Sequence, residues 1–145
     1  MLYRLKNCIS TLLALVVCLA VGACLYARDR VALRVLQGER TFYLQSASSQ
    51  SLIKQTLSFK DLPYLAGESV TFILQEEKEG ALREILRLYE AEILFTEEAC
   101  GVVSYYASAK KLGKGIDLYG YAVNLHIAIE GTRCAVGTPI IFGGF

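Results

Sequence analysis

The chain has 145 residues, of which 54% are hydrophobic, and its formal net charge is +1 at pH 7. Beyond residue 27 the balance is thirteen Lys and Arg (fifteen less Arg4 and Lys6) against fourteen Asp and Glu, a net charge of −1. Proteins that bind nucleic acids carry an excess of basic residues, so this balance argues against nucleic-acid binding. The length suits one small domain after a leader.

Residues 8–27 form an uncharged, apolar block. A helix of twenty residues rises ~30 Å, the thickness of the hydrocarbon core of a bilayer, so we predict that the chain enters a membrane through this block. Three fates stay open: an uncleaved transmembrane anchor, a signal sequence cleaved after Ala23, and lipidation of Cys24, because the sequence Val-Gly-Ala-Cys at 21–24 resembles a bacterial lipobox.

Basic residues lie on both sides of the block, Arg4 and Lys6 before it and Arg28, Arg30 and Arg34 after it, so the positive-inside rule gives no clear direction. An N-terminal apolar block most often directs export of the residues after it. We therefore expect the domain on the extracytoplasmic side of the cell membrane, or secreted if the leader is cleaved. We divide the chain into a leader (1–27), a linker (28–40) that is either juxtamembrane or a solvated spacer, and a domain (41–145).

The first part of the domain is predicted to be a hairpin followed by a third strand. β-favouring residues at Thr41–Ala47 and Ser51–Phe59 flank a small polar turn at 46–50, and Glu68–Gln75 alternates apolar and polar residues. Apolar residues at helical spacing predict an amphipathic helix over Ala81–Glu90, with Leu82, Ile85, Leu86 and Tyr89 on its apolar side. A fourth strand is expected at Ile93–Thr96, and the strand–helix–strand order predicts that the third and fourth strands are parallel and joined by a right-handed crossover.

The last part is predicted to be mostly strand. A fifth strand is expected at Gly101–Ala107, a basic loop at 110–115, an extended stretch at Ile116–Tyr119, and a final hairpin formed by Val123–Ile129 and Thr132–Ile141. The fold class is α+β: a mixed, mostly antiparallel sheet of five to seven strands, with one main helix packed on one face, after an N-terminal hydrophobic helix.

Few residues suggest chemistry. Alternation in the final hairpin predicts that His126 and Asn124 face water, so we interpret His126 as a surface residue rather than a general base. The acidic pairs Glu97-Glu98 and Glu76-Glu77 lack the spacing of a calcium loop. No catalytic, cofactor-binding or metal-binding residue is assigned, and we predict that the protein is not an enzyme.

Two other features are singled out. Cys100 and Cys134 are either bridged, which an exported protein allows, or two thiols with at least partial burial. Neighbouring aromatic and basic residues suggest a surface that contacts another molecule. This candidate interaction surface comprises Tyr105, Tyr106, Lys110, Lys111, Lys114 and His126.

The C-terminal region resembles the YwmB-like family of Firmicutes. The resemblance is carried by Val-Asn-Leu-His-Ile-Ala at 123–128, by Gly-Thr-Pro-Ile-Ile at 137–141 and by the terminal aromatic Phe145, and it extends loosely back to about residue 45. It implies an exported α+β domain with a fold like that of the TATA-box-binding protein. His126 stands where the family motif has glutamine and Phe145 where it has tyrosine. The family supplies no catalytic residue to transfer, and a fold alone does not confer a function.

Together these features predict an extracytoplasmic, membrane-tethered binding or structural module of a Gram-positive cell envelope, whose partner is an envelope protein or a wall polymer. The alternatives are a small enzyme that acts on envelope polymers, which would need His126 or a carboxylate pair in a pocket, and, less favoured, nucleic-acid binding through the sheet.

Overall fold

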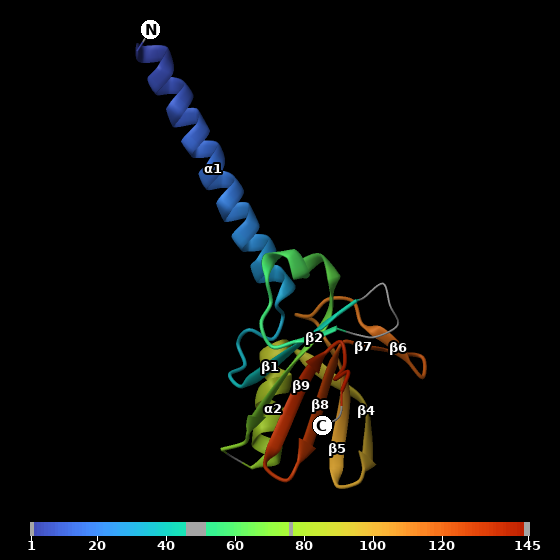
Figure 1. The fold of residues 1–145 in the computed structure, drawn as a ribbon. Helices are drawn as coiled ribbons and strands as arrows, with labels where there is room; N and C mark the ends of the chain where they lie inside the picture. Colours follow the sequence, from blue (N-terminus) through green and yellow to red (C-terminus); the bar gives the residue numbers. More distant parts are fainter. Residues whose placement is uncertain (1, 46–51, 76, 144–145) are drawn as a thin grey trace. The chain divides into compact units, whose positions relative to one another are not determined.

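The structure is a computed structural model that describes residues 2–45, 52–75 and 77–143. The turn expected at 46–50, Glu76 and the terminal Phe145 lie outside the described residues. The chain forms two compact units, Met1–Val31 and Ala32–Phe145 (Figure 1).

The first unit is one helix, α1, Leu2–Arg30. Within it Ile9–Ala27 is long and apolar enough to cross a membrane, a property that a signal sequence shares, and none of this segment is buried within the structure. The helix continues without a break through Cys24. Near its end the Arg30 guanidinium lies 5.2 Å from the centre of the Tyr26 ring. Aromatic and basic residues of this kind are enriched where a helix leaves the hydrocarbon region.

The second unit is built on a seven-stranded sheet in which every pair of neighbouring strands is antiparallel. The strand order is β2-β1-β3-β9-β8-β5-β4, and two further strands, β6 and β7, form a separate hairpin (Figure 1). The strands are β1 Glu39–Leu44, β2 Leu52–Lys54, β3 Leu65–Ile73, β4 Ala91–Ala99, β5 Val102–Ala109, β6 Ile116–Leu118, β7 Tyr121–Val123, β8 Leu125–Glu130 and β9 Arg133–Thr138. The α+β class with one main helix, α2 (Lys78–Tyr89), is confirmed.

The strands β3 and β4 run in the same direction, as the crossover predicts. They do not pair with each other, because β9, β8 and β5 lie between them. The C-terminal hairpin β8–β9 occupies the middle of the sheet and pairs with β3 on one side and β5 on the other, because its residues are apolar or small enough to be buried on both faces. The helical crossover therefore spans the central strands instead of joining adjacent ones.

One local prediction is wrong. Among the described residues of the expected second strand, strand structure is confined to Leu52–Lys54, and Phe59–Tyr64 forms a 3-10 helix, η1. Ser58 and Asp61 form a capping box at its start, and Lys54 donates to Asp61 Oδ1 at 2.6 Å. These hydrogen bonds, that of Lys54 first, lower the pKa of Asp61 to about 2.

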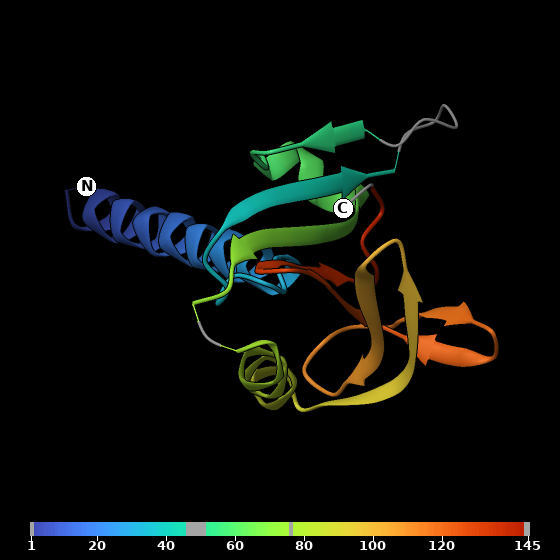
Figure 2. The same ribbon diagram turned by 90° about the horizontal axis from the view of Figure 1, so that it is seen from below.

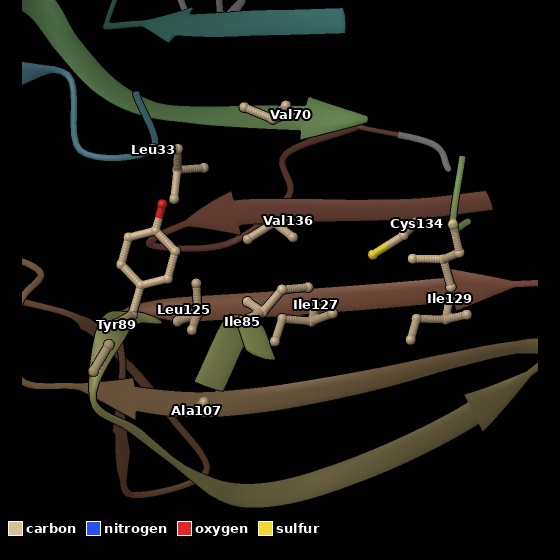
Figure 3. Close-up of a cluster of buried hydrophobic side chains, with 12 residues drawn as sticks. Leu33, Val70, Ile85, Tyr89, Ala107, Leu125, Ile127, Ile129, Cys134 and Val136 are labelled. Carbon is tan, nitrogen blue, oxygen red and sulfur yellow. The ribbon is translucent and has the colours of Figure 1, made fainter. Parts of the chain in front are cut away.

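The core lies between α2 and one face of the sheet. The predicted stripe of α2 is confirmed: Ile85 and Tyr89 are buried, and Leu82 and Leu86 pack partly buried against the same cluster. Figure 3 shows Ile85 and Tyr89 of this helix beside side chains from the central strands. Burial of each large apolar side chain stabilises the fold by roughly 1.5–3 kcal/mol. The buried side chains from the sheet are Val70, Ala107, Ala109, Leu125, Ile127, Ile129, Cys134 and Val136.

The folded unit begins at Ala32, earlier than the boundary expected at Thr41. Leu33 is fully buried in the core, and its backbone N–H donates to Glu68 Oε1 at 2.7 Å. Arg40 donates to Glu68 Oε2 at 3.1 Å, and also to the carbonyls of Leu33 (3.0 Å) and Leu36 (3.2 Å). These contacts, which we call the Glu68 clamp, make the segment after Ala32 part of the domain instead of a solvated spacer.

The carboxylate in the clamp is almost inaccessible, since Glu68 is 1% exposed. Burial raises its pKa above the ordinary value, although the Leu33 amide and Arg40 act in the opposite direction. Burial also raises the pKa of Tyr89 to about 12, and the Tyr89 hydroxyl has no hydrogen-bond partner among the described residues.

Candidate interaction surface

The face of the sheet opposite α2, which we call the outer face, carries a row of stacked rings. The register aligns Phe95 of β4 with Tyr106 of β5, and Tyr106 with His126 of β8. The Phe95 and Tyr106 rings stack with centroids 4.5 Å apart, and the Tyr106 and His126 rings stack at 4.3 Å. Such pairs add ~0.5–1.5 kcal/mol beyond the burial of their area. We call these three residues the aromatic row.

The β6–β7 hairpin extends the row toward solvent. Figure 2 shows this hairpin on the side of the sheet away from α2. Tyr119 and Tyr121 approach Phe95 with ring centroids at 5.8 and 5.6 Å. Tyr119 is 82% exposed and Tyr121 46%. The structure therefore gathers four aromatic rings and one imidazole at one end of the outer face.

Tyr119 sits in an unfavourable backbone conformation. Tyr119 and Gly120 form the two-residue loop between the paired residues Leu118 and Tyr121. Their φ angles are +55° and +86°, as in a type I′ turn. The Gly120 amide donates to Asp117 Oδ1 at 3.2 Å. Asn, Asp and Gly are the residues that favour the first position of this turn, and a large aromatic residue there costs conformational energy. The fold therefore holds an exposed tyrosine ring where a smaller residue would be more stable.

His126 is not the surface residue that alternation predicted, because it is 8% exposed. The chain after β9 returns over the outer face, and the Ile141 amide donates to His126 Nδ1 at 3.3 Å. Gly137 makes this possible, since a Cβ there would lie 2.7 Å from Ile141 Cγ1. Asn124 is buried too, and its side chain holds the chain at Ala109 and Gly113 through three hydrogen bonds.

The imidazole of His126 is unsuited to catalysis. Burial lowers its pKa to about 4, so it is neutral near pH 7. Its Nδ1 accepts the Ile141 amide, so the proton lies on Nε2, which is buried without a hydrogen-bond partner among the described residues. Neither nitrogen offers a free lone pair to a substrate.

The returning segment, residues 139–143, covers the other end of the outer face. The Phe142 ring lies 5.3 Å from the Tyr43 ring, and the Tyr43 hydroxyl hydrogen-bonds Ser69 Oγ at 3.1 Å. Gly67 gives Phe142 room, because a Cβ there would lie 2.6 Å from Phe142 Cε2. The Phe95 end of the aromatic row is the part left open to solvent.

The predicted interaction surface is divided by the fold. Tyr106 and His126 lie together in the aromatic row, whereas Tyr105 faces the other way and packs against the core. The basic loop lies at the C-terminal end of α2: Lys111 donates to the Leu88 carbonyl at 3.0 Å and pairs with Glu90 at 3.2 Å. Lys110 and Lys114 are exposed in the same loop.

The acidic pair at 97–98 is divided in the same way. Glu97 is aligned with Ser104 on the outer face, and Glu98 with Val103 on the other face, so the two carboxylates do not converge. Burial, followed by a hydrogen bond with Glu97, raises the pKa of Tyr106. Across the part of the chain that the structure describes, no group of three or more His, Cys, Asp or Glu side chains is arranged to hold a metal ion.

Cys100 and Cys134 are free thiols and do not form the disulfide considered above. Cys100 is exposed in the β4–β5 turn, whereas Cys134 is fully buried on β9. Val103 is aligned with Ile129, and Ile129 with Cys134. Cys134 therefore lies two strand spacings, about 9–10 Å, from the nearest residue of β5. This distance exceeds the ~7 Å that can separate the Cα atoms of a disulfide.

The sequence interpretation missed Phe95, the residue that joins the row to the hairpin. Its only local signal is its place in a strand, and its stacking depends on β4 lying beside β5. Comparison of the chain with protein-family models, with curated proteins and with solved structures finds no match in any of the three.

Proposed function

We propose that the chain is a membrane-tethered binding module whose folded unit lies on the extracytoplasmic side of a Gram-positive cell envelope. The observation that carries this proposal is Tyr119, an 82% exposed ring held at positive φ beside the aromatic row. Unfavourable backbone conformations that persist in a fold are concentrated at functional sites. The apolar helix α1 supports the tether, and the resemblance to the YwmB-like family motivates the compartment.

A binding role is favoured over an enzyme acting on envelope polymers. His126 is neutral with both nitrogens sequestered, and Glu97 and Glu98 point to opposite faces. A groove of about 280 Å³ between α2 and the segment after Ala32 is slightly smaller than typical small-molecule sites, which have volumes of roughly 300–1,000 Å³. Its lining holds one carboxylate and no nucleophile: Val35, Leu36, Gln37, Phe72, Ala81, Glu84, Ile85 and Leu88.

The side of the membrane is tested by labelling Cys100 in intact cells with a membrane-impermeant maleimide. Cys100 is exposed, whereas Cys134 is buried and its pKa is raised to about 12 by that burial. The labelling lost in a Cys100→Ser variant is therefore that of Cys100. We expect this labelling before permeabilisation. Labelling that appears only after permeabilisation would place the domain in the cytoplasm and refute the proposal.

The contact surface is tested by photo-crosslinking in intact cells, with a benzophenone amino acid at Tyr119. The matched control carries the same group at Tyr64, which is 60% exposed on η1. We expect a discrete crosslinked product from position 119 and none from 64. Equal products from the two positions, or none from either, would show that Tyr119 does not lie in a specific contact surface.

A further inference from the structure

The strand β4, which carries Phe95 of the aromatic row, has a free edge. In the sheet order β4 is the last strand, and β5 is its only strand partner among the described residues. β4 is nine residues long and largely exposed. One side of an edge strand presents backbone N–H and C=O groups that an added strand can pair with.

The side chains of β4 give this edge a chemical preference. Glu92, Glu97 and Glu98 are exposed, and neither β4 nor β5 contains a Lys or Arg. The nearest basic residue along β5 is Lys110, which follows Ala109 and therefore lies near Ala91, at the end of β4 away from Glu97 and Glu98. The half of β4 that carries Glu97 and Glu98 therefore favours a positively charged partner. A second copy of the chain would bring the same carboxylates to the shared edge, which disfavours self-pairing.

Aromatic rings lie on the same part of the edge. Phe95 and Glu97 both face the outer side of the sheet, two residues apart and therefore ~7 Å along the strand. Tyr119 meets Phe95 edge to face, with an interplanar angle of 73°, and Tyr121 meets it at 40°. Rings at such angles, beside a carboxylate, can surround a cation within ~6 Å of their centres. Charged residues on an edge strand prevent aggregation without any help from aromatic residues. The exposed rings at this edge therefore suggest a role in binding.

We propose that the edge of β4 takes an extended segment of a partner protein as an additional strand, with a lysine or arginine of that segment held by Phe95, Tyr119 and Glu97. The proposal rests on the proposed function, because it names the partner of the same surface. The backbone ladder supplies affinity, and the cation site selects the segment and fixes its register.

The test uses the full chain in nanodiscs of zwitterionic phosphatidylcholine, so that the lipid does not itself attract a basic probe. The probe is a fluorescent peptide in which lysine alternates with valine, and binding is read by anisotropy. Two matched peptides accompany it: one has glutamate in place of lysine, and the other is N-methylated at alternate backbone amides. We expect the lysine peptide to bind and both matched peptides to bind at least about three-fold more weakly.

Variants of the chain locate the site. Glu97→Gln and Tyr119→Asn should each weaken binding by about two- to five-fold, from the loss of one exposed ion pair or one cation–π contact. Asparagine suits the turn at 119, so that variant keeps the hairpin. Glu79→Gln, which removes the same charge from the first turn of α2, should leave binding unchanged.

Each contrary result would exclude a different part of the proposal. Equal binding of the lysine and glutamate peptides would exclude the cation site. Equal binding of the N-methylated peptide would exclude strand addition and indicate a cationic polymer as the partner instead. If the lysine peptide fails to bind while position 119 still crosslinks in cells, this inference fails and the proposed function stands. Failure of both experiments would remove both proposals.

Discussion

Replacing Arg40 by methionine should destabilise the folded unit more than any other single change to an exposed or half-exposed charge. The side chain of Arg40 is 20% exposed and that of Glu68 1%, so the variant leaves a buried carboxylate that is held by backbone amides such as that of Leu33. The Leu36 carbonyl also loses its Arg40 donor, and the Leu33 carbonyl keeps only the bond from the Leu36 amide at 3.0 Å. Removing one partner of a buried pair costs ~3–5 kcal/mol. Because Arg40 is partly exposed, we expect a cost at the lower end of that range, about 3 kcal/mol, near pH 7.5.

The pH dependence separates the effect of charge from the loss of packing. Burial already raises the folded-state pKa of Glu68, and loss of Arg40 would raise it further. A carboxyl group whose pKa is raised by folding contributes stability below its unfolded pKa, and this contribution is lost as pH rises through the folded pKa. The cost of Arg40→Met should therefore be smaller at pH 5 than at pH 7.5. Adding Glu68→Gln, which keeps an acceptor for Leu33 but removes the charge, should restore most of the loss.

The assay is urea unfolding of the full chain in micelles, followed by the near-ultraviolet circular dichroism of its tyrosines. The control is Arg34→Met, which removes an exposed charge from the same segment and should change the free energy of unfolding by less than ~0.5 kcal/mol. A cost below about 1 kcal/mol for Arg40→Met, or a cost that is the same at both pH values, would refute the account of the Glu68 clamp.

Three further outcomes are expected on the outer face. Burial lowers the pKa of His126 to about 4, so the free energy of unfolding of the wild type should fall by up to ~3 kcal/mol between pH 6.5 and pH 4. In urea titrations at pH 7 and 4.5, His126→Gln should remove this loss. A variant with the same pH dependence as the wild type would contradict this account. Tyr119→Asn should stabilise the unit by about 0.5–1 kcal/mol while it weakens binding of the lysine peptide, and a lower urea midpoint would count against strain at this turn. Gly67→Ala should cost ~1–3 kcal/mol by overpacking against Phe142, and part of that cost should vanish when Phe142→Ala is added; purely additive effects would refute the contact.

Local periodicity predicts those elements whose partners lie nearby in the sequence. The stripe of α2 is found because helical spacing brings Leu82, Ile85 and Tyr89 to one side whatever they pack against. The same reasoning explains why the adjacent strand residues Tyr105 and Tyr106 lie on opposite faces of the sheet. It does not reveal which face is open, because that depends on where α2 and the returning C-terminal segment lie.

Long-range pairings account for the wrong predictions. Alternation in β8 predicts one wet face, but residues 139–143 cover His126, and the only local signal for this is the small side chain at Gly137. The β8–β9 hairpin inserts between β3 and β5 and so keeps β3 apart from β4. The periodicity of a single strand carries no information about such an insertion. The extent of the linker is wrong because Arg40 has its partner at Glu68, far along the chain.

Because the Glu68 clamp fixes Leu33, the connection between α1 and the folded unit is short. Only Val31 and Ala32 separate the end of α1 at Arg30 from Leu33, which is fixed in the core. Three residue steps span at most ~11 Å, whatever orientation the domain adopts. If α1 is retained in a bilayer, this short connection would keep Leu33, and the strands packed around it, close to the end of the membrane helix.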